Sequence, residues 1–91
     1  MDTMNAYHHN FSSAGTHTIE LHEKPRTVLV KNMTNNKIKL SWGNAINNND
    51  YIEMLKETAE LVPYFGMSES DLNLTIQATG TGDVEVRIVE Y

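Results

Sequence analysis

Residues 72–88 read LNLTIQATGTGDVEVRI, and this stretch decides the fold. Apolar and polar side chains alternate strictly over 72–76 and again over 84–88. Successive side chains of a β-strand point to opposite faces, so the pattern predicts two strands with one dry and one wet face each. The glycine-containing segment 79–83 between them is typical of a turn and predicts a hairpin.

The same alternation recurs earlier in the chain and predicts strands over about 16–22, 26–33 and 37–42. Asn35 and Asn36 mark a turn, because asparagine tolerates positive φ and bonds its own backbone, and they predict a hairpin between 26–33 and 37–42. A polar loop over residues 43–50 follows, and its composition predicts an exposed segment.

Residues 51–62 fit two structures. Asp50 and Glu53 have the spacing of a capping box, apolar residues recur at helical spacing, and Pro63 would end a short helix. The same residues also alternate around a charged segment, 56–58, which would be the turn between two strands. Periodicity alone slightly favours the helix, and both interpretations remain open.

A sheet with one dry face must pack on another layer, and a chain of 91 residues has room for one domain. We therefore expect an all-β fold, a small antiparallel β-sandwich of jelly-roll or immunoglobulin-like type with about seven or eight strands. The sandwich would occupy residues 15–91. Residues 1–14 show no sustained period and would be an N-terminal arm or a first edge strand.

Composition excludes several classes of protein. A net charge of −5 with only 7 Lys and Arg argues against a nucleic-acid-binding surface, which needs clustered cations. The absence of cysteine leaves no disulfide framework and no thiolate zinc site, as is usual for proteins of a reducing cytoplasm. No apolar run approaches the roughly 20 residues of a membrane-spanning helix, and no signal-peptide pattern opens the chain, so we expect neither membrane insertion nor secretion.

No motif predicts catalysis or metal binding. His17 and His22 are five residues apart and would point to opposite faces of a strand, as would the adjacent His8 and His9, so no set of metal ligands converges. The carboxylates are scattered, and no serine has the surroundings of a nucleophile. We therefore expect a non-enzymatic protein with no catalytic residues, no metal and no cofactor.

Aromatic and apolar residues supply the candidate contact sites. Trp42 shares its register with Ile38 and Leu40, which predicts a core position. The alternative is a carbohydrate-binding site formed by the loop 43–50 and nearby aromatic residues, with a platform drawn from Trp42, Tyr51, Tyr64, Phe65 and Tyr91. An N-terminal arm can add a strand to a neighbour's sheet edge, and apolar clusters near loops often contact protein. The interface residues predicted on these grounds are Tyr7, His8, His9 and Phe11 in the N-terminal segment, and Tyr64, Phe65 and Met67.

Three phrases, read together, carry a resemblance: 28–33 (VLVKNM), 38–43 (IKLSWG) and 70–87 (SDLNLTIQATGTGDVEVR). They resemble small β-sandwich structural proteins in the virions of tailed bacteriophages and prophages, over roughly residues 15–91. The chain departs from that pattern at 55–58, where such proteins often have a turn with proline or glycine. The resemblance favours two strands over a helix in 51–62, and it supplies no functional residue.

The resemblance implies a role as well as a fold. Such proteins are non-enzymatic virion parts, such as capsid decoration proteins and neck or tail components, and they commonly form homo-oligomers that dock on other virion proteins. The expected function is therefore structural, in a virion assembled from protein made in the bacterial host cytoplasm. The alternative is a carbohydrate-binding β-sandwich module for attachment to the host cell.

Overall fold

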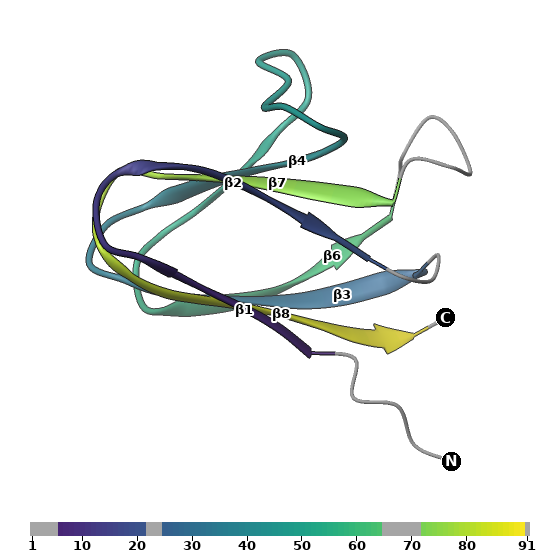
Figure 1. Ribbon diagram of the computed structural model, residues 1–91. Coiled ribbons are helices and arrows are strands. Elements are labelled where there is room, and N and C mark those ends of the chain that lie inside the picture. The colour runs from purple at the N-terminus through teal and green to yellow at the C-terminus, as the bar shows by residue number, and fades with distance from the viewer. Residues whose placement is uncertain (1–5, 22–24, 65–71, 91) are drawn as a thin grey trace.

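The computed structural model describes residues 6–21, 25–64 and 72–90, and these residues are all-β. Eight strands form two antiparallel sheets of four strands each, packed face to face (Figure 1). The prediction of a small antiparallel β-sandwich is confirmed. The strands are β1 (Ala6–Phe11), β2 (Gly15–Glu20), β3 (Thr27–Thr34), β4 (Ile38–Trp42), β5 (Ile52–Met54), β6 (Thr58–Pro63), β7 (Asn73–Ala78) and β8 (Gly82–Glu90).

The strand order distinguishes the two sandwich types that the sequence allows. Sheet A has the order β1-β8-β3-β6, and sheet B has the order β2-β7-β4-β5. Pairs therefore form between β1 and β8, β2 and β7, β3 and β6, and β4 and β5, as if one long hairpin had been wrapped over two sheets. This nested pairing is the jelly-roll arrangement rather than the immunoglobulin-like one.

Both predicted hairpins are wrong, although both turns are in the right place. β3 and β4 belong to different sheets, and so do β7 and β8, so each turn carries the chain from one sheet to the other. Among the described strands, only β4 and β5 are consecutive and hydrogen-bonded. A turn signal marks where a chain reverses, but burial of both dry faces decides which strands pair.

The two turns instead bond to each other at one end of the sandwich. Asn35 N donates to Thr81 O and Thr81 N donates to Asn35 Oδ1, both at 3.0 Å. Gly82 then begins β8 with φ of 130°, in close contact with β3: a Cβ there would lie 2.8 Å from the Met33 carbonyl oxygen. Only glycine fits this backbone conformation and this approach.

Residues 51–62 form two strands, as the resemblance favoured, and the turn between them contains Glu57 at φ of 57°. Asn32, which is fully buried on β3, holds this turn in place. Its Nδ2 donates to the carbonyl oxygens of Leu55 (3.0 Å), Asn36 (2.9 Å) and Met54 (3.4 Å). Its Oδ1 accepts from Thr34 N at 3.0 Å and from Thr34 Oγ1 at 2.6 Å.

The core lies between the sheets, where the inward-facing apolar residues of all eight strands meet. Trp42 packs against it at the end of β4, in register with Ile38 and Leu40 as predicted. The buried core residues are Phe11, Ile19, Leu21, Val28, Val30, Ile38, Leu40, Met54, Val62, Leu74, Ile76, Ala78, Val84, Val86 and Ile88.

Candidate functional site

The two sides of the sandwich differ in their edge strands. On one side lie β1 of sheet A and β2 of sheet B, joined by the short connection 12–14 and nearest the viewer in Figure 1. On the other side lie β5 and β6, joined by the turn that contains Glu57. We call these the β1/β2 side and the β5/β6 side. No strand of the described residues lies beyond any of these four edges.

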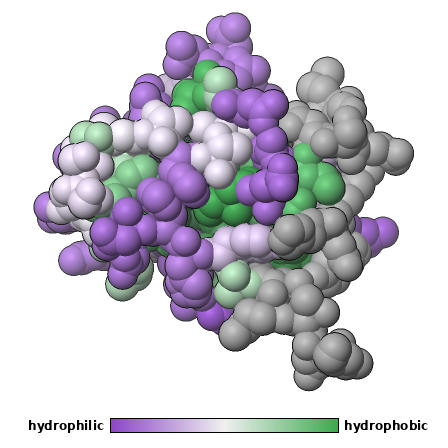
Figure 2. Space-filling model, viewed as in Figure 1, coloured by the Kyte–Doolittle hydropathy of each residue, from purple (hydrophilic) through white to green (hydrophobic). Residues whose placement is uncertain are grey.

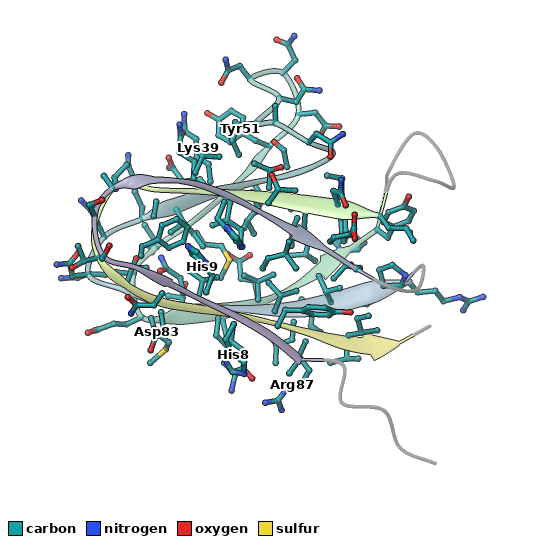
Figure 3. The ribbon with its side chains drawn as sticks, viewed as in Figure 1. His8, His9, Lys39, Tyr51, Asp83 and Arg87 are labelled. Carbon is teal, nitrogen blue, oxygen red and sulfur yellow. The ribbon has the colours of Figure 1, made fainter. Side chains whose placement is uncertain are left out.

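A pair of stacked imidazoles closes the β1/β2 side. His9 of β1 and His17 of β2 lie face to face, with ring centroids 3.6 Å apart and ring planes 8° apart. The edge of Phe11 contacts His9, with centroids 4.6 Å apart. Figure 3 shows His9 directed into the space between the sheets. Burial, and to a smaller extent the neighbouring His9, lowers the pKa of His17 below its ordinary value of 6.5.

The predicted N-terminal contact residues are split by the alternation of β1. Tyr7, His9 and Phe11 face the core, and Phe11 is only 4 % exposed, so it cannot reach a partner unless the strand detaches. His8 points outward beside Glu85 of β8 (Figure 3). Residues 6–11 are thus an edge strand of sheet A, paired with β8 along their whole length.

The other predicted contact residues lie around the end of β6. Tyr64 is half-buried and packs edge-on against Trp42, with ring centroids 4.8 Å apart. Trp42 Nε1 donates to the Pro63 carbonyl oxygen at 3.0 Å, so both rings are held in the structure of this corner. Phe65 and Met67 lie outside the described residues.

Apolar side chains are exposed on the outer face of sheet A. Leu61 of β6 is 64 % exposed and lies directly opposite Leu29 of β3, and Val89 of β8, 48 % exposed, is the next outward residue after Arg87, which also pairs with Leu29. Met33 is 58 % exposed farther along β3. An apolar group that spans three neighbouring strands is a common feature of protein contact surfaces.

Charged residues lie beside this apolar group. Glu85 of β8 accepts a hydrogen bond from Arg87 Nη2 at 2.7 Å and lies 3.6 Å from Lys31 Nζ and 3.9 Å from His8 Nε2. The Arg87 hydrogen bond, followed by the charges of Arg87, Lys31 and His8, lowers the pKa of the Glu85 carboxyl against the opposing effect of burial. The outer face of sheet A therefore combines an apolar group with a cluster of paired charges.

The loop 43–50 projects from the end of β4 (Figure 1), and hydrogen bonds join it to β4 and β7. Asn47 N donates to Ser41 Oγ at 2.9 Å, Asp50 N donates to the Asn47 carbonyl oxygen at 3.0 Å, and Asn73 bonds the Asn44 side chain. Beside the loop, Tyr51 is 41 % exposed and Lys39 Nζ lies 4.7 Å from its ring centroid. Figure 3 shows both side chains on the outer surface of sheet B.

The described residues contain no group of three or more His, Asp or Glu side chains placed to hold a metal ion. Every buried side-chain nitrogen or oxygen of these residues has a hydrogen-bond partner. No helix of the described part of the chain is long and apolar enough to cross a membrane.

Comparisons of the chain with protein-family models, with curated proteins and with solved structures find no significant match. The functional conclusions therefore depend on the residues and their geometry.

Sequence reasoning missed the pairing of His9 with His17. The two residues lie on strands of different sheets, and no spacing along the chain signals a contact between sheets. The only available signal is that three of the four histidines fall within residues 8–17.

Proposed function

We propose that the protein is a non-enzymatic structural component that acts through contacts with other proteins, in the virion of a phage or prophage as its sequence resemblance implies. It self-associates and docks on other virion proteins. The observation that carries this proposal is the apolar group on the outer face of sheet A, formed by the half-buried Leu29 and the exposed Leu61 and Val89.

The surroundings of this group support a protein contact. Protein interfaces combine a central apolar area with a polar rim that provides orientation. Here the rim contains Glu85, whose three basic neighbours leave it paired before any partner arrives. A partner that covers the apolar group gains the hydrophobic free energy of burial without having to neutralise an isolated charge.

Light scattering of the purified protein over a concentration series tests this proposal. We expect a discrete oligomer with one number of copies, because closed symmetry is how such parts fit a shell or a tail. A mass that stays monomeric at every concentration would contradict self-association.

A second candidate function is carbohydrate binding, which the exposed ring of Tyr51 beside the ordered loop 43–50 favours. An exposed aromatic ring flanked by amide side chains can stack on a sugar ring and bond its hydroxyl groups. In that case Tyr51→Ala abolishes sugar binding in calorimetric titrations, whereas Leu61→Ala on the other sheet leaves it unchanged. Because Lys39 lies over the Tyr51 ring, Lys39→Met serves as a second variant that opens the ring face.

A further inference from the structure

The charged residues are unevenly distributed along the chain. None of the 7 Lys and Arg or the 12 Asp and Glu residues falls within residues 3–19, although they make up 21 % of the chain. This stretch contains all of β1 and β2 except Glu20. On this side of the sandwich, β1 therefore has no Lys, Arg, Asp or Glu residue, and β2 has only Glu20 at its end.

Figure 2 shows the molecule from this side. Hydrophobic atoms are visible between the two front edge strands, partly covered by polar side chains. The side chains that close the gap include the stacked His9 and His17. Side chains of β1 and β2 thus cover the core here, and no described strand lies in front of them.

The β5/β6 side is built differently. β5 has only three residues, which leaves little backbone for a partner to pair with. β6 ends with Pro63, and its Glu60 occupies a core-facing register opposite Val30. Short edges, proline and inward-pointing charges are the devices by which proteins prevent edge-to-edge pairing. β1 has none of these, with six residues and neither proline nor glycine.

We propose that a second copy of this chain pairs its β1 antiparallel with β1 across a two-fold axis, so that sheet A continues through both copies. This proposal rests on the proposed self-association and assigns it to the β1 edge, a different surface from the apolar group on the outer face of sheet A. An edge strand related to itself by a two-fold axis presents matching N–H and C=O groups, and main-chain hydrogen bonds then supply the contact.

The distribution of charge favours β1 as the edge through which two copies meet. The chain has a net charge of −5, so two copies repel each other over most of their surfaces. β1 is an edge along which two copies approach without bringing Asp or Glu residues of the paired strands together. β2 is the less suitable edge, because it begins with Gly15 and ends with the charged Glu20.

The geometry of antiparallel pairing limits the register. Residues directly opposite each other in an antiparallel pair point to the same face of the sheet. In a two-fold symmetric pair, one residue must therefore lie directly opposite the same residue of the other copy, next to the axis. Two registers pair five residues each within β1. In the first, His8 faces His8 of the other copy; in the second, His9 faces His9, and His8 faces Asn10.

A charge placed on β1 tests the surface. Lysine on an edge strand opposes pairing with another edge, and at position 8 its ammonium group would lie beside the Glu85 carboxylate, so the monomer stays folded. We expect His8→Lys to weaken dimerisation at least tenfold, measured as mass by light scattering. The matched control is Leu55→Lys, which adds the same charge at an exposed position of the β5/β6 side and leaves the mass unchanged.

Cross-linking tests the register, because the chain has no cysteine. Residues directly opposite in an antiparallel pair have Cα atoms about 4.5–5.5 Å apart, within the range of a disulfide. His8→Cys alone is expected to form a disulfide dimer in the first register. In the second, a disulfide forms only when His8→Cys and Asn10→Cys proteins are mixed. Leu55→Cys is the control and forms none.

The outcomes separate this proposal from the proposed function. A two-fold pairing of β1 requires an even number of copies, so a trimer or pentamer overturns it while supporting self-association. If the oligomer is even but His8→Lys leaves its mass unchanged and neither cysteine experiment gives a disulfide dimer, the β1 pairing is overturned while self-association still stands. A wild-type protein that is monomeric at every concentration overturns both.

Discussion

The β1/β2 side and the β5/β6 side of the sandwich each consist of one edge strand from each sheet, but different interactions hold them. The β5/β6 side is held by a buried polar network, in which Asn32 reaches from β3 to the carbonyl oxygens of the turn. On the β1/β2 side, β1 pairs with β8 and β2 with β7, and side-chain hydrogen bonds join Asn10 to Asp83 and Thr18 to Thr75. Between β1 and β2 themselves, the contact is made by apolar packing and by two stacked imidazoles. The contact between the two sheets is therefore fixed by a fully buried asparagine on the β5/β6 side and by stacked and apolar side chains on the β1/β2 side.

The difference shows that one side of a small sandwich can stabilise the fold while the other side is available to bind a partner. Hydrogen bonds to buried carbonyl groups are costly to break, so the β5/β6 side cannot open without exposing unsatisfied groups. The charged and shortened edges there also resist a partner strand. The β1/β2 side has neither restraint, which leaves it available for pairing and makes it sensitive to protonation.

Replacement of Asn32 is expected to have the largest effect. Asn32→Ala removes the donor to three carbonyl oxygens and the acceptor for Thr34, and each buried group left without a partner costs about 1–3 kcal/mol. We expect the free energy of unfolding to fall by about 3 kcal/mol, measured by urea denaturation at fixed protein concentration. Asn48→Ala, in the exposed loop, is the control and should change it by less than about 0.5 kcal/mol. A loss for Asn32→Ala no larger than that of the control would show that the network does not hold the β5/β6 side.

Acid is expected to destabilise the β1/β2 side by a smaller amount. The pKa of His17 is lowered in the folded state, so below pH 6.5 the His17 imidazole is protonated more readily in the unfolded chain than in the folded one. Stability should therefore decrease as the pH falls from 6.5 toward the folded pKa, and this contribution should be absent above that window. Urea midpoints measured between pH 7.5 and pH 5 test this expectation.

His17→Phe provides the matched variant, because it keeps a ring beside His9 and removes the titrating group. We expect a flatter pH dependence than that of the wild type. The lowered pKa of Glu85 acts in a separate window: its stabilisation is present above the ordinary pKa of 4.5 and is lost as the pH falls through the lower folded value. An unchanged slope in His17→Phe would mean that other groups cause the pH dependence.

The strands were predictable from the sequence, but their partners were not. Period-two alternation located β3, β4, β7 and β8, because each of these strands has one face on the core. Nothing local distinguishes a turn that closes a hairpin from one that crosses between sheets. The bond between Asn35 and Thr81 is therefore invisible in the sequence, since it joins two turns that are far apart along the chain.

The same limit applies to the candidate site. β1 is too short and too polar for its alternation to be recognised, so Phe11 was expected at a contact surface and lies in the core instead. The exposed group of Leu29, Leu61 and Val89 was missed for a related reason. It becomes a group only through the pairing of β3 with β6 and β8.

Glu60 provides the smallest and most specific test of the difference between the two sides. Because Glu60 is exposed and no described partner neutralises it, Glu60→Thr should change the free energy of unfolding by less than about 0.5 kcal/mol. Its effect should appear in association instead, since the substitution removes the inward-pointing charge that protects β6. In the His8→Lys background, where β1 pairing is blocked, we expect Glu60→Thr to raise the average mass at high concentration. Glu60→Lys keeps a charge at this position and should remain at the mass of the background. If both variants stay at that mass, the short β5 and Pro63 are enough to protect this side, and the charge of Glu60 contributes nothing to the difference.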